Sequence, residues 1–72
     1  MRSFSDSHGQ IWQAALGHES HGTLLIIFSR LGSFEVFKSG LDASNRLDAE
    51  NEIAALSEAE LCNRLQAAAP WS

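Results

Sequence analysis

Residues 23–29, Thr-Leu-Leu-Ile-Ile-Phe-Ser, decide the fold of this chain because they are its strongest strand signal. The run is short, rich in β-branched and aromatic residues, and flanked on both sides by glycine turns. Its apolar side chains alternate between two faces, with Leu24, Ile26 and Phe28 on one and Leu25 and Ile27 on the other. Both faces are therefore apolar, although one face of an antiparallel sheet normally meets water.

Three further short stretches around this run are expected to pair with it, at residues 3–5, 10–16 and 34–38. All five glycines lie within the first forty residues, and such spacing is typical of turns between short strands. Residues 1–40 are therefore predicted to form an antiparallel meander of three or four strands.

Residues 41–72 have no glycine and are rich in Ala, Leu and Glu, a composition that predicts helices. Ser44 is the expected N-cap of a first helix over residues 45–56. Ser57 and Glu60 have the spacing of a capping box, so a second helix should begin there and end at Pro70. The chain is thus predicted to be a single α+β domain over residues 1–72, with two short C-terminal helices packed on one face of the sheet.

Composition and charge narrow the class of protein. With 44% hydrophobic and 19% charged residues, the chain is expected to fold rather than remain disordered. The net charge of −4 arises entirely in residues 41–72, which hold two Arg against six Asp or Glu. Nucleic-acid binding through the tandem helices is therefore not favoured, since Arg64 is the sole basic residue of the last helix.

The sequence has no apolar run long enough to span a membrane, nothing at its start reads as a signal peptide, and it has one cysteine, Cys62. A lone thiol suits a reducing compartment, so a cytoplasmic location is expected.

The side chains that could carry chemistry are few. His18, Glu19 and His21 share one turn, but zinc needs three or four ligands, and His8 should lie at the other end of strand 10–16. Cys62 sits in an acidic helix, a setting that disfavours a catalytic thiolate. We therefore expect no metal site, no cofactor and no enzymatic activity.

The two-faced strand instead predicts a protein interface. A pair of short helices can cover only one face of the sheet. Either the sheet curls on itself to bury its second face, or a partner covers that face. The expected partner is a second copy of the chain or a larger complex, and the chain a small accessory or regulatory subunit. The expected interface residues are Leu25, Ile27, Phe37 and Trp71. If the helices cover the opposite face, the set becomes Leu24, Ile26 and Phe28.

Two alternatives stay open from the residues alone. Trp71, next to the last position, either folds back onto the sheet of its own domain or inserts into a partner. The acidic half of the chain could instead make the protein an inhibitor that blocks a basic, nucleic-acid-binding site on another protein, with binding that weakens steeply in salt.

Three sequence patterns carry a resemblance. They are Phe4-x-Asp6-x-x-Gly9-x-x-Trp12, Gly17-x-Glu19-Ser20-x-Gly22 and Leu56-Ser57-x-x-Glu60-Leu61. Together they resemble a group of short bacterial proteins with no assigned activity. The resemblance implies a bacterial cytoplasmic protein with a strand meander and a helical tail. It carries over no metal role, because that group has other residue types where His18 and His21 stand here.

Overall fold

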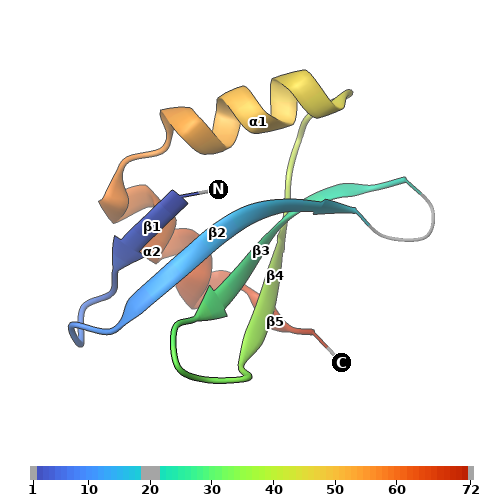
Figure 1. Ribbon diagram of the computed structural model, residues 1–72. Helices are drawn as coiled ribbons and strands as arrows, with labels where there is room; N and C mark the ends of the chain where they lie inside the picture. The colour runs from blue at the N-terminus through green and yellow to red at the C-terminus, as the bar shows by residue number, and fades with distance from the viewer. Residues whose placement is uncertain (1, 19–21, 72) are drawn as a thin grey trace.

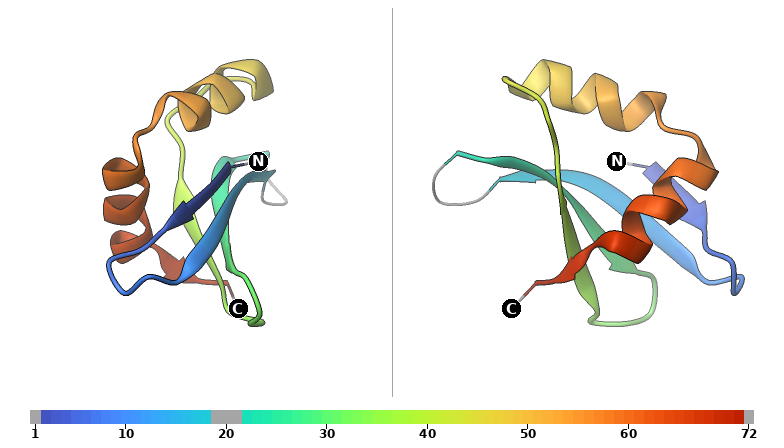
Figure 2. Two further views of the ribbon diagram at one scale, coloured as in Figure 1. Left: turned by 60° about the vertical axis from the view of Figure 1, so that its left-hand side comes forward. Right: turned by 180° about the vertical axis from the view of Figure 1, so that it is seen from behind.

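A computed structural model describes residues 2–18 and 22–71 and has the predicted α+β architecture. The strands are β1 (Arg2–Ser5), β2 (Ile11–His18), β3 (Leu24–Arg30), β4 (Val36–Gly40) and β5 (Ala69–Pro70), and the helices are α1 (Arg46–Ala55) and α2 (Glu58–Ala67). The sheet is antiparallel in the order β1-β2-β3-β4-β5, so the first four strands form the predicted meander. Both helices lie on one side of the sheet (Figures 1 and 2).

The fifth strand is the main addition to the prediction. Helix α2 ends at Ala67, and the chain then turns back so that Ala69 and Pro70 pair with Lys38 and Phe37 of β4. Proline has no backbone N–H to donate, and here it lies in the strand at the edge of the sheet, where a missing donor is tolerated. The tail of the chain thereby covers the edge of β4.

The helix starts follow from local capping chemistry. The predicted capping box of α2 is confirmed, since the Ser57 hydroxyl accepts from the Glu60 N–H and the Glu60 carboxylate accepts from the Ser57 N–H, both at 3.2 Å. For α1 the prediction was one residue early. Asn45, not Ser44, is the N-cap, and its side chain accepts from the Asp48 N–H at 2.9 Å.

One face of the sheet and the two helices enclose the hydrophobic core. Its buried members are Phe4, Trp12, Ala14, Ile26, Phe28, Ile53, Leu56 and Leu61. The rings of Phe4 and Phe28 meet edge to face, with centroids 5.9 Å apart. The set of Leu24, Ile26 and Phe28 is therefore the one that faces the helices.

Arg2 ties the first strand to the end of α1. This helix has no basic residue in its last turn, where carbonyl groups lack partners within the helix. The Arg2 guanidinium donates to the carbonyl of Ile53 at 3.1 Å and to that of Leu56. A cation at this position also interacts favourably with the helix dipole.

Candidate interaction site

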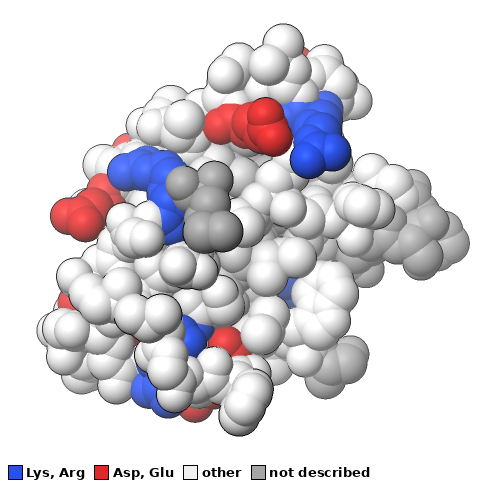
Figure 3. Space-filling model, in the orientation of Figure 1, with Lys and Arg blue, Asp and Glu red and all other residues white. Residues whose placement is uncertain are grey.

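The helices leave the other face of the sheet uncovered, and we call it the open face. Cα pairing across the strands assigns its residues, because directly paired residues point to the same side. They include Ile11, Gln13, Ala15, Gly17, Leu25, Ile27, Ser29, Val36 and Lys38. Seen in space-filling form from this side, the centre of the sheet is largely free of charged side chains, most of which lie around its margin (Figure 3).

The side chains of Leu25 and Ile27 fill part of the open face themselves. Gly17 lies opposite Leu25, and a Cβ placed on it would come within 2.2 Å of Ile27 Cδ1 and 3.2 Å of Leu25 Cδ1. The two side chains thus occupy the space that a side chain at Gly17 would need. Leu25 is 2% exposed as a result, so it supports the surface from beneath instead of presenting an apolar contact.

The prediction that Phe37 shares this face is wrong. Phe37 pairs directly with Phe28, a core residue that faces the helices. Its ring packs against Trp12 at 5.7 Å between centroids. The alternation within residues 34–38 was read correctly, but the position of this strand along β3 places Phe37 on the covered side.

Trp71 lies against its own domain, as the fold-back alternative predicted. Its backbone N–H donates to the Val36 carbonyl at 2.9 Å, and Lys38 Nζ lies 5.3 Å from the centre of its ring. The side chain is nevertheless 45% exposed. Fold-back and contact with a partner are therefore compatible, because nearly half of the surface of Trp71 stays accessible.

Trp71 was predicted as an interface residue, and three further exposed apolar side chains that were not predicted there lie at the same end of the sheet. We call Ile11, Leu31, Phe34 and Trp71 the turn-end cluster, and all four are exposed, Phe34 fully. The Leu31 N–H donates to the Ile11 carbonyl at 2.9 Å, which brings the start of β2 beside the end of β3. Phe34 was expected inside a strand, but β4 begins at Val36 and leaves Phe34 in the preceding turn. The sequence did offer a signal for Ile11. It neighbours Trp12 in the predicted strand, so the two side chains must point to opposite faces of the sheet.

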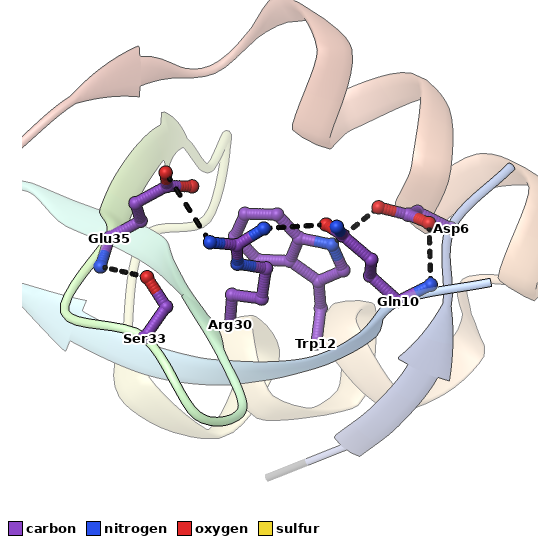
Figure 4. Close-up of polar contacts among 6 residues, drawn as sticks. All are labelled: Asp6, Gln10, Trp12, Arg30, Ser33 and Glu35. Atoms are coloured by element: carbon purple, nitrogen blue, oxygen red, sulfur yellow. Dashed lines mark hydrogen bonds and ion pairs between the residues drawn. The ribbon is translucent and has the colours of Figure 1, made fainter. Parts of the chain in front are cut away.

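A chain of polar contacts crosses this end of the sheet (Figure 4). One oxygen of the Asp6 carboxylate accepts from the Trp12 indole N–H at 2.8 Å, and the other accepts from the His8 and Gln10 backbone N–H groups. The Trp12 hydrogen bond, with smaller help from the two backbone bonds, lowers the pKa of Asp6 below its ordinary value.

The same chain of contacts continues towards β4. Arg30 donates to the Gln10 side chain at 2.9 Å and lies 3.5 Å from the Glu35 carboxylate. The first turn and the β3–β4 turn are thereby linked. The side chains of Asp6, Gln10, Arg30 and Glu35 thus contact groups within the fold. Their role is to hold the two turns beside the turn-end cluster.

The residues considered for metal binding or catalysis do not gather. His8 precedes β2 and His18 ends it, so they stand at opposite ends of that strand. Glu19 and His21 lie outside the described residues. The Cys62 thiol donates to the Ser5 carbonyl at 3.3 Å. Within residues 2–18 and 22–71, no three His, Cys, Asp or Glu side chains are arranged to hold a metal ion.

Five of the six acidic side chains of the helical half have a local structural role. Glu50 lies 3.5 Å from Arg46 and Glu52 lies 3.4 Å from Arg64. Three further carboxylates stand in the first turns of the helices, where negative charge favours the helix dipole: Asp48, Glu58 and Glu60. These five carboxylates thus have structural roles in the helices, and the acidic inhibitor stays an alternative prediction.

Comparison with known proteins gives no matching family model, no similar curated protein and no similar solved structure. The resemblance to short bacterial proteins thus stays a prediction. None of the described helices is long and apolar enough to cross a membrane.

Proposed function

We propose that this chain is a small non-catalytic interaction subunit that binds a second copy of itself through the open face and the turn-end cluster. The observation that carries the proposal is the one-sided covering of a sheet whose central strand is apolar on both faces. Exposed apolar patches of this kind mark interaction sites.

For two copies of this chain, charge favours a face-to-face arrangement over contact through the helices. Each molecule carries −4, and the acidic excess belongs to the helical half. The two helices lie behind the sheet when the open face is in front (Figures 1 and 2). Two molecules that meet through their open faces therefore keep their acidic helices apart, whereas contact through the helices would bring like charges together.

Size sets the extent of such an interface. A standard interface removes about 800 Å² from each partner. That is about a sixth of the 4701 Å² surface of this molecule, so the turn-end cluster alone is too small. The open face must contribute from β2 across to Trp71, with Ile27 and Val36 near its centre.

The test is the concentration dependence of the solution mass. Sedimentation equilibrium should show a rise from the 7.9 kDa monomer towards a dimer of about twice that mass over a micromolar series. Ile11→Ser and Phe34→Ser should each weaken association by at least about tenfold, the effect of a moderate apolar contact. Neither substitution removes a core residue, so the monomer should stay folded.

Leu47→Ser is the matched control. Leu47 is a large exposed apolar residue, 67% accessible, but it belongs to α1 and not to the sheet. Its loss should leave association unchanged. A monomeric mass at all concentrations up to the millimolar range would overturn the proposal, and so would equal weakening by Leu47→Ser and Ile11→Ser.

A further inference from the structure

The edge of β2 is covered along only half of its length. β1 pairs with Ile11 to Ala14, and the described residues place no strand beside Leu16 and His18 on that side. Backbone groups of alternate residues in an antiparallel strand point to the same neighbour. Ile11 accepts from Leu31 on the β3 side, so the N–H and C=O groups of Leu16 and His18 point to the uncovered edge.

A cavity of about 450 Å³ lies beside this edge, between β2 and α1. Its apolar wall is formed by Leu16, Ile53 and Ala54. Leu16 faces the helix side of the sheet together with Trp12 and Ala14. A strand added beside Leu16 would point its own paired side chain to that same side, and hence into the cavity.

Charged side chains also line the cavity. Arg2 and Arg46 line it with one carboxylate, Glu50, so the lining has a positive excess although the whole chain is acidic. The first turn of α1, which contains Arg46, lies over the end of β2 that contains His18 (Figure 1). An acidic residue opposite His18 would therefore lie on the side of Arg46, which shares the cavity lining with Glu50.

We propose that the uncovered edge of β2 at Leu16 and His18 binds an extended segment of another protein as an added antiparallel strand. The segment carries an apolar residue opposite Leu16, in the cavity, and an acidic residue opposite His18, near Arg46. Main-chain hydrogen bonds supply the affinity in this mode of recognition, and the side-chain pocket supplies the specificity. This site lies apart from the open face and does not depend on self-association.

The probe is the peptide acetyl-Thr-Glu-Thr-Val-Thr-amide, in which valine and glutamate lie on one side of an extended strand. Titrated into the ¹⁵N-labelled chain, it should shift the amide resonances of Leu16 and His18 and slow their hydrogen exchange at least fivefold at saturation. The same peptide with N-methyl groups on valine and glutamate lacks the two donors that would face β2, and it should produce neither effect.

Two pairs of variants separate edge binding from other contacts. His18→Pro removes an edge donor and should weaken binding at least fivefold, whereas Ser3→Pro, which removes an outward donor of β1, should not. Ala54→Trp fills the cavity from an exposed position of α1 and should abolish the response, whereas Leu47→Trp places the same ring elsewhere on that helix and should not.

Three results would overturn the proposal. The first is the absence of any shift at millimolar peptide. The second is an equal response to the N-methylated peptide. The third is a response centred on open-face residues such as Ile11 and Val36, which would place the peptide on the self-association surface.

Discussion

A single carboxylate organises the first turn and orients a core residue. Asp6 accepts from two backbone N–H groups of the first turn and also from the indole N–H of Trp12, a residue that is 5% exposed. An indole N–H that is removed from water needs a partner, because an unsatisfied buried donor is costly. Asp6 therefore connects turn chemistry to core packing.

The lowered pKa of Asp6 predicts a pH-dependent stability difference. A carboxylate whose pKa is lower in the folded state stabilises the fold above its unfolded pKa, and this stabilisation disappears as the pH falls through the folded value. Wild type should therefore resist urea better than Asp6→Asn at pH 7, and the gap should close below about pH 4. Comparing the two urea midpoints between pH 7 and pH 2 cancels the shared titration of the other carboxylates. A gap that stays constant over this range contradicts the prediction.

Arg2 is the residue whose structural role was least accessible from sequence. Its guanidinium reaches the carbonyl of Ile53, a residue 51 positions away along the chain. Capping boxes are local and can be recognised from a four-residue spacing, as Ser57 and Glu60 were. A helix end stabilised by an arginine from the first strand has no such local pattern.

At the scale of elements, β3 bears out the expectation drawn from residues 23–29. Ile26 and Phe28 are core residues, and Leu25 and Ile27 point to the side without helices. Alternation within a strand follows from backbone geometry and can be predicted. The phase between two strands depends on the length of the turn that joins them. That length set Phe37 opposite Phe28, and a single sequence does not reveal it.

The open face also depends on the absence of a side chain at Gly17. Gly17→Ala would place a Cβ 2.7 Å from Ile27 Cγ1, so Ile27 must move outwards. We expect a loss of about 1 kcal/mol in the free energy of unfolding, typical of mild overpacking. Urea denaturation measures it, and the double variant with Ile27→Val should recover part of the loss because the contact is then smaller. Strictly additive effects would show that the two side chains do not compete.

At the scale of the whole molecule, the helices and most of the acidic charge lie on one side of the sheet, and the open face lies on the other (Figure 2). The helices supply the second layer of the core and the acidic excess (Figure 2), while the centre of the open face is largely free of charged side chains (Figure 3). This separation distinguishes the two functions considered from sequence. Self-association through the open face should persist or strengthen as salt screens the repulsion between two acidic chains. Blocking of a basic site would weaken in salt.

Trp71 joins the fold of the monomer to the proposed interface, because it is held on β4 and still half exposed. Trp71→Ala should weaken self-association by about 2 kcal/mol, the effect of an aromatic anchor. The monomer should lose less, about 0.5–1 kcal/mol, since Trp71 is an exposed residue whose ring contacts Lys38.

Sedimentation equilibrium measures the first quantity, and urea denaturation below the dissociation constant measures the second. Trp71→Phe keeps an aromatic ring at this position, so it should retain most of the self-association of the wild type. Truncation after Pro70 should weaken self-association as much as Trp71→Ala does. If both Trp71→Ala and the truncation destabilise the monomer while self-association is unchanged, Trp71 serves the fold alone. The interface must then be centred on Ile27 and Val36.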